Sequence, residues 1–275
     1  METDKSDNEV RKLKYDVGFI GAGNMGGALA KAIAKTGRSV AIADKDTKKA
    51  EALSCELSSI ACDNLDIAEN AKYIFLAVKP QVLPYVLGEL SPILEKRTDS
   101  FTLVTMAAGK SISFIEEMCE KNYPVIRIMP NTPVSIGQGM ILYCRNELIS
   151  DDSEFCDMLK YAGCLDEISE GLIDSASCVS GCGPAWVYMF IEALADGGVN
   201  CGLPRDKALT YAAETLIGAG KLVIESGEHP EKLKDDVCSP GGTTIAGVHA
   251  LENNSFRASV INAVEAAYKR TLELK

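Results

Sequence analysis

The feature of this sequence that most restricts its fold is a glycine pattern near the start of the chain. Gly21-x-Gly23-x-x-Gly26 directly follows an apolar segment, residues 15–20, and directly precedes an alanine-rich segment that reaches about residue 36. Between a strand and a helix, such glycines allow a tight turn and a close approach of the backbone to a pyrophosphate, whose charge faces the helix N-terminus. An ordinary glycine-rich turn is the alternative, but this context favours a dinucleotide site.

Apolar segments typical of buried strands recur through the first part of the chain. They cover residues 15–20, 39–43, 73–78, 101–106, 125–129 and 140–144. Helical segments alternate with them, as at residues 50–57, and Ser113-x-x-Glu116 resembles a capping box at the start of another helix. Apolar strands that alternate with helices predict a parallel sheet covered on both faces.

The pattern changes after about residue 168. Strand-like segments stop, and residues 184–200, 204–226 and 256–274 favour helices. A chain of 275 residues suits two domains. The sequence therefore predicts an α/β protein with a flexible tail over residues 1–14, a Rossmann-like dinucleotide-binding domain over 15–168 and an all-helical domain over 169–275.

Charge and cysteine content argue against several classes of function. A net charge of -11 makes nucleic acid an improbable partner. The ten cysteines form no CxxC pair and there are only two histidines, so we expect no metal and no disulfides. The polar start, residues 1–14, is no secretory signal, and residues 175–191 contain too many glycine and proline breaks for a membrane span. We expect a cytoplasmic protein with reduced, mostly buried thiols.

The acid that follows the second strand bears on cofactor choice. Asp44 stands where a carboxylate usually binds the adenosine ribose, which favours NADH and repels a 2′-phosphate. Lys45, Lys48 and Lys49 could bind that phosphate, or could equally form a solvated helix face. The sequence leaves the preference between NADH and NADPH open.

Two further segments have a candidate chemical role. Lys79-Pro80 follows an expected strand, at the sheet edge where ligands bind, although a simple turn explains it equally well. Ser239-Pro-Gly-Gly-Thr-Thr244 places small and hydroxyl residues at an expected helix start, where N–H groups could hold a carboxylate; plain helix capping is the alternative. No Ser-His-Asp set accompanies them. Reduction of an imine, which needs positioning more than a strong acid, fits this inventory.

At these residues the chain resembles the pyrroline-5-carboxylate reductase family, and the resemblance extends over nearly all of the chain after the tail. The motifs that carry it are Val17–Met25, Ala77–Pro80, Arg127–Pro133, Ser180–Ala185, Ala193–Gly198, Gly202–Pro204 and, most specifically, Leu233–Glu252. Two positions depart from the family pattern. Asp44-Lys-Asp46 is more acidic than an NADPH-preferring member would have, and Cys182 stands where a serine is familiar.

The resemblance implies roles for individual residues. Gly21 to Met25 would hold the pyrophosphate, Asn64 would contact the adenosine ribose, and residues 129–131 would lie near the nicotinamide. The full set of expected cofactor-binding residues is Gly21, Ala22, Gly23, Asn24, Met25, Asp44, Lys45, Asn64, Ala77, Val78, Lys79, Met129, Pro130 and Asn131. The expected substrate-binding residues are Val237, Ser239, Gly242, Thr243 and Thr244, with Thr244 as the catalytic residue directed at the ring nitrogen.

The implied reaction is hydride transfer from NADPH or NADH to the imine carbon of 1-pyrroline-5-carboxylate, which yields L-proline. The resemblance also implies a homodimer formed through the C-terminal helices, and some members form rings of dimers. Two rival hypotheses are a β-hydroxyacid dehydrogenase and a non-catalytic NAD(P)-binding protein. The first would need a lysine base, and no lysine stands between Lys234 and Lys269. The second is disfavoured because both halves of the site are intact.

Overall fold

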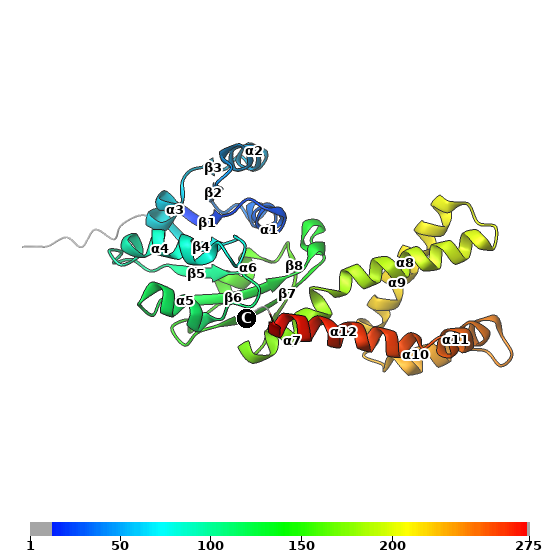
Figure 1. Cartoon of the computed structure of the whole chain (residues 1–275). Helices are drawn as coiled ribbons and strands as arrows, with labels where there is room; N and C mark the ends of the chain where they lie inside the picture. The colour runs from blue at the N-terminus through cyan, green and yellow to red at the C-terminus, as the bar shows by residue number, and fades with distance from the viewer. Residues whose placement is uncertain (1–12, 274–275) are drawn as a thin grey trace, which may run out of the picture. The chain divides into compact units, whose positions relative to one another are not determined.

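The computed structural model describes residues 13–273 and divides them into two compact units (Figure 1). The first unit runs to Gly181 and includes the last turn of the final helix, from Thr271; the second unit is residues 182–270. Most of the predicted tail lies outside the described residues. Lys14 is part of the folded unit, because its N–H bonds to the carbonyl of Asn70 at 3.2 Å.

The first unit is built on one sheet of eight strands. The strands are β1 (Tyr15–Ile20), β2 (Val40–Ala43), β3 (Ile60–Ala61), β4 (Ala71–Leu76), β5 (Thr102–Thr105), β6 (Val125–Pro130), β7 (Gly139–Arg145) and β8 (Gly163–Glu167). Their order is β3-β2-β1-β4-β5-β6-β7-β8. The part β3-β2-β1-β4-β5-β6 is parallel and has the doubly wound order in which dinucleotides bind beside the first strand.

Helices cover both faces of this sheet and make up the second unit. Those of the first unit are α1 (Asn24–Ala34), α2 (Thr47–Leu57), α3 (Asn64–Asn70), α4 (Leu83–Leu94), α5 (Ile112–Cys119), the 3-10 helix η1 (Thr132–Ile136), α6 (Ser153–Met158) and α7 (Glu170–Ser180). The others are α8 (Gly183–Asn200), α9 (Arg205–Ser226), α10 (Pro230–Val237), α11 (Thr243–Asn253) and α12 (Phe256–Glu273). The predicted class, a Rossmann-like domain followed by helices, is confirmed.

The last two strands differ from the all-parallel sheet that the sequence predicts. β7 runs antiparallel to β6, and β8 is parallel to β7. The reason is the length of the connection between Pro130 and Gly139, which holds only η1. A parallel return needs a crossover of a dozen or more residues, whereas an antiparallel partner can follow a short turn. β7 and β8 are joined across α6, which leaves room for a parallel return.

Two local expectations are also wrong. β8 was not anticipated, because Gly163–Glu167 holds two acids and only one large apolar residue. The cap of α5 is Ser111, whose hydroxyl accepts the N–H of Phe114 at 3.1 Å, so Ser113 lies inside the helix. Both serines stand within the same turn, and the capping-box pattern cannot tell which of them has extended backbone.

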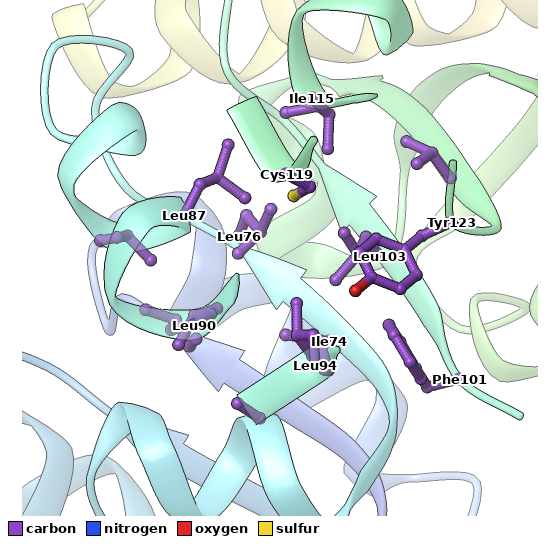
Figure 2. Packing of buried hydrophobic residues seen from close by; sticks show 14 of the residues in the cluster. Ile74, Leu76, Leu87, Leu90, Leu94, Phe101, Leu103, Ile115, Cys119 and Tyr123 are labelled. Atoms are coloured by element: carbon purple, nitrogen blue, oxygen red, sulfur yellow. The ribbon is translucent and has the colours of Figure 1, made fainter. Parts of the chain in front are cut away.

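Apolar side chains from four helices close one face of the sheet (Figure 2). Leu87, Leu90 and Leu94 of α4 lie against strand residues such as Ile74, Leu76 and Leu103, all fully buried. Residues of α3, α5 and α7 complete this cluster. α4 and α5 are amphipathic, and their apolar faces are buried against the strands. This removal of apolar surface from water holds the two helices on the sheet.

The opposite face of the sheet is packed against α1, α2 and α6. Phe19 and Phe75, from adjacent strands, stack with their ring centroids 4.6 Å apart. Leu29 and Ile33 of α1 are fully buried in the same cluster. Because β1 is packed on both sides, the loop that follows it starts from a fixed point.

A buried ion pair fixes α7 to the sheet. The guanidinium of Arg127 on β6 donates to the carboxylate of Asp174 at 2.7 Å, and the two side chains are only 3% and 9% exposed. Glu170 lies 3.3 Å from the same guanidinium and accepts the N–H of Ile112 at 2.7 Å. α7 is therefore part of the first compact unit, which runs to Gly181.

We expect Asp174→Ala to lower the free energy of unfolding by about 3 kcal/mol, because the variant leaves a buried guanidinium with one partner fewer. Urea unfolding followed by circular dichroism measures the change. Asp157→Ala is the matched control, since Asp157 bonds to Arg38 at 2.8 Å but is half exposed, and we expect little change there. Equal effects of the two variants would contradict the role given to Arg127.

The second unit has little core of its own. Its buried cluster consists of Ala195, Ala208 and Ala212, where α8 packs against α9. Helices α10, α11 and α12 bury no residue in the single chain, and large apolar side chains are exposed, such as Ile224 at 83% and Met189 at 67%. Surfaces of this kind are typical of subunit interfaces.

Within the described chain, one stretch is long and apolar enough to count as a candidate membrane span. It covers residues 170–200, and a single stretch of this kind is weak evidence. It consists of two helices, α7 and α8, separated at Gly181 and Cys182, and it carries the ion-paired Asp174.

The expectation of mostly buried cysteines is wrong. All ten are free thiols, but only Cys119, Cys144 and Cys178 are buried, and four are exposed. The other cysteines are less buried because several of them lie on helix surfaces or in turns that the rest of the single chain does not cover. Burial raises the pKa of the Cys144 thiol to about 12, so that thiol stays protonated and unreactive at neutral pH.

Candidate active site

The first group of predicted site residues gathers where β1 and β4 end side by side. Ile20 pairs with Leu76, and the N–H of Ala77 donates to the carbonyl of Ile20 at 2.8 Å. The loop after β1, which begins at Gly21, and the loop after β4, residues 77–79, therefore share the carboxyl edge of the sheet. This is the switch point at which ligands bind in doubly wound folds.

The three glycines of the pattern are required for different reasons. Gly21 has φ of +113°, and a side chain there would meet the Ala77 carbonyl oxygen at 2.4 Å. A side chain at Gly26 would meet the Gly21 carbonyl oxygen at 2.4 Å, so this glycine lets helix and strand pack closely. At Gly23 φ is -71° and nothing lies within 4 Å of the added carbon. Neither the backbone conformation nor a neighbouring protein atom requires glycine at position 23. The close approach of a ligand remains as the reason for a glycine there.

A pocket of about 530 Å³ lies against this loop. The glycine-rich loop contributes Ala22, Gly23, Asn24 and Met25 to its wall, and η1 contributes Thr132 and Ser135. Its volume is that of small-molecule and cofactor sites. The free N–H groups at the start of α1, which no side chain caps, face a region suited to an anion. The loop, the helix start and the open space together fit a dinucleotide pyrophosphate.

Asp44 and Asn64 border the same edge, and their side chains have partners within the protein. The carboxylate of Asp44 accepts the N–H of Ala22 at 2.8 Å and that of Asp46 at 2.9 Å. The amide of Asn64 donates to Glu89 at 3.0 Å. Lys45 and Lys79 are exposed, and neither forms an ion pair with the described residues. Positive charge is thus available on both sides of the loop.

The end of β6 adds Met129, Pro130 and Asn131. Asn131 is buried, and its carboxamide is committed on both sides: the oxygen accepts the N–H of Met140 at 2.8 Å, and the nitrogen donates to the carbonyl of Ser180 at 2.9 Å. These bonds fix the start of η1. Any contact of Asn131 with a cofactor would therefore come from its backbone or its remaining amide proton.

The second group of predicted site residues lies in the second unit, between α10 and α11. Gly242 caps α11, and a side chain there would lie 2.2 Å from the Ser239 hydroxyl oxygen, so the two residues are in close contact. Gly241 has φ of +67°, which aims the chain into the helix. The N–H groups of Thr243 and Thr244 stand in the first turn, where a helix has no internal partner for them. The helix start that the sequence predicts is present, with these N–H groups in its first turn.

The remaining expected residues are placed consistently with these two groups. Val237 ends α10 and is exposed, and Thr244 is half-buried. Sequence reasoning missed six residues that line the pocket beside the glycine-rich loop, namely Gly27, Ala28, Lys31, Leu53, Thr132 and Ser135. The last two directly follow the Met129–Asn131 segment, and extending that motif by one turn would have included them. A larger hollow of about 900 Å³ beside α5 and β7 contains none of the predicted residues.

The sheet order, the open glycine loop and the helical second unit define a two-domain NAD(P)-dependent oxidoreductase. Family models agree with this class. Residues 16–109 match a model described as NADP oxidoreductase coenzyme F420-dependent, and residues 170–274 match a model described as pyrroline-5-carboxylate reductase dimerisation.

Individual relatives cover the whole fold. Pyrroline-5-carboxylate reductase 3 of Xenopus laevis is 38% identical, over 96% of this chain and 97% of its own. Pyrroline-5-carboxylate reductase of Glycine max is 38% identical, over 94% and 96%. The crystal structure of Plasmodium falciparum pyrroline carboxylate reductase with NADP bound has a TM-score of 0.83 and 34% identity, over 95% of this chain and 98% of that one. The chain belongs to the pyrroline-5-carboxylate reductase family.

Proposed function

We infer that this chain reduces 1-pyrroline-5-carboxylate to L-proline with NAD(P)H, the last step of proline biosynthesis. The observation that carries this conclusion is the full-length match to named pyrroline-5-carboxylate reductases, joined to a glycine loop whose middle glycine faces open space. The β-hydroxyacid dehydrogenase hypothesis is set aside, because the relatives over nearly the whole chain are named pyrroline-5-carboxylate reductases.

We propose that the cofactor lies along the carboxyl edge of the sheet in the first unit. Backbone N–H groups of Asn24 and Met25, at the start of α1, hold the pyrophosphate. Residues 77–79 border the cofactor on one side and the Met129–Asn131 segment on the other. The lining of the pocket supports adding Thr132 and Ser135 to this set.

Lys45 and the exposed Lys48 and Lys49 at the start of α2 are available for a 2′-phosphate, since none of them has an ion pair among the described residues. The relative from Plasmodium falciparum was crystallised with NADP. We propose that the chain accepts both cofactors and prefers NADPH.

In the second unit, the start of α11 binds the substrate carboxylate. The N–H groups of Gly242, Thr243 and Thr244 and the hydroxyl of Ser239 are the donors, and the helix dipole favours the negative charge. Val237 borders the ring. The nicotinamide would supply the hydride that C5 of the imine accepts. The Thr244 hydroxyl contacts the ring nitrogen, which takes up its proton before or during hydride transfer with that hydroxyl or a water assisting, and the contact orients the ring.

We propose a homodimer formed through the second unit, and the same helices would serve a ring of dimers. The shortage of core in this unit and its exposed apolar residues support a partner there. The match to the dimerisation model begins at residue 170, which supports a functional boundary at 168–169. We further propose a cytoplasmic enzyme that binds neither nucleic acid nor membrane, supported by the net charge of -11.

The test is an assay of purified protein with 1-pyrroline-5-carboxylate, in which oxidation of NADH and of NADPH is followed by the loss of their absorbance. We expect oxidation tied to formation of L-proline, faster with NADPH at equal concentration. Oxidised cofactor with 3-hydroxy acids is the control for the dehydrogenase alternative. Folded protein that binds cofactor but yields no proline would overturn the reductase assignment.

A further inference from the structure

The carboxylate of Asp44 joins two backbone segments at the cofactor edge. Oδ2 accepts the N–H of Ala22, inside the glycine-rich loop, at 2.8 Å, and Oδ1 accepts the N–H of Asp46 at 2.9 Å. The main chain makes a parallel link just before, where the N–H of Gly21 donates to the carbonyl of Ala43 at 2.7 Å. The end of β2 thus holds the loop after β1 through both a backbone and a side-chain bond.

The position of Ala22 explains why this second bond matters. Gly21, on one side of it, donates its N–H to the Ala43 carbonyl and has no room for a side chain beside the Ala77 carbonyl, while Gly23, on the other, faces open space. The Asp44 bond therefore holds the loop just before it reaches the region of the pyrophosphate. A hydrogen bond to a carboxylate is about twice as strong as a neutral one, so Asp44 restricts the loop at the point where a ligand approaches it.

An acid that discriminates NADH from NADPH does so by offering its oxygens to the ribose hydroxyls and by repelling a 2′-phosphate. Here each oxygen of Asp44 already accepts a backbone N–H, so only its second lone pair is open to a ribose hydroxyl. The neighbouring side chains at the start of α2, Lys45, Lys48 and Lys49, are exposed and without ion pairs in the described chain, so they offset the charge of Asp44.

We propose that Asp44 is a positioning residue: it holds the Ala22 N–H and so presents the glycine-rich loop to the pyrophosphate that NADH and NADPH share, and it does not set the preference between them. This inference rests on the cofactor site proposed above. It reverses the expectation that the sequence alone gives for Asp44, which is a preference for NADH.

The experiment measures dissociation constants of NADH and NADPH by the fluorescence of the bound cofactor, for the wild type, Asp44→Asn, Asp44→Ala and Asp46→Asn. We expect Asp44→Ala to weaken NADH and NADPH alike, by about tenfold, because a bond to a charged group is lost, and Asp44→Asn to weaken both by a smaller factor, because its carboxamide oxygen accepts one N–H without the charge. The ratio of the two constants should change less than about twofold. In steady-state assays the KM for both cofactors should rise by a similar factor, whereas the KM for 1-pyrroline-5-carboxylate should stay within about twofold of the wild type, a split that general loss of structure would not produce.

Asp46→Asn is the matched control, because it removes the same charge two residues away and leaves the Asp44–Ala22 bond in place. Tighter NADPH binding by Asp44→Asn, with NADH binding unchanged, would overturn the inference in favour of charge repulsion. Wild-type affinities for both cofactors in Asp44→Asn and Asp44→Ala would overturn it as well. A wild type that binds neither cofactor would instead remove the cofactor site itself, and the inference with it.

Discussion

Gly23→Ala is expected to weaken binding of NADH and NADPH by about 30-fold or more, the equivalent of about 2 kcal/mol for one lost hydrogen bond to a charged group. The added carbon meets no protein atom within 4 Å, and the φ of -71° suits alanine. The methyl group would instead occupy the space into which a pyrophosphate must come. The unfolding free energy should fall by less than about 1 kcal/mol, the difference between glycine and alanine as a helix cap.

Gly26→Ala is the matched comparison, because the same methyl group would there lie 2.4 Å from the Gly21 carbonyl oxygen and 2.8 Å from the Ala77 side chain. We expect this variant to lose about 1–3 kcal/mol of stability through overpacking. Fluorescence titration and urea unfolding of both variants separate the two effects. Normal cofactor affinity in Gly23→Ala would place the pyrophosphate elsewhere.

Thr244→Ala is expected to lower kcat by about a hundredfold, the usual contribution of a side chain that assists protonation or stabilises charge in the transition state. Its hydroxyl stands in the first turn of α11, beside the proposed carboxylate-binding N–H groups. NADPH binding should stay within about twofold of the wild type, since the cofactor residues lie in the other group. Steady-state kinetics with 1-pyrroline-5-carboxylate, together with cofactor titration, check both statements.

Two further variants isolate the hydroxyl of Thr244. Thr244→Ser keeps it and should retain most of the activity, whereas Thr244→Val keeps the shape without the hydroxyl and should resemble Thr244→Ala. Equal activity of the serine and valine variants would remove the Thr244 hydroxyl from the mechanism.

Much of the first unit could be predicted from sequence because its strands are buried on both faces. Tyr15–Ile20 and the strand near Tyr73 are almost wholly apolar, which only a covered sheet accommodates. β8 could not be found in this way, because it lies at the sheet edge, has only one large apolar residue and ends in two adjacent acids. The reversal of β7 was accessible from loop length alone, since Pro130 and Gly139 are too close in sequence for a crossover helix.

The candidate site was predictable to the level of motifs but not of hydrogen bonds. Periodicity and spacing place Gly23 and Asp44 at the correct edge of the sheet. They cannot indicate that the carboxylate of Asp44 accepts the N–H of Ala22. Nor can they indicate that the carboxamide of Asn131 forms hydrogen bonds with Met140 and Ser180. Such bonds depend on side-chain rotamers and on neighbours from distant parts of the chain. Neither can be inferred from the pattern of a single sequence.

The return of the last turn of α12 to the first unit has a consequence for synthesis on the ribosome. Thr271 lies beside Cys178, with the sulfur and the hydroxyl oxygen 3.8 Å apart, and both belong to the first unit. Domains usually fold in the order in which they emerge. Here α7 makes its contact with Thr271 only after residue 271 has left the exit tunnel. Nascent chains halted before Thr271 should therefore hold a nearly complete sheet on which Cys178 of α7 still lacks this neighbour.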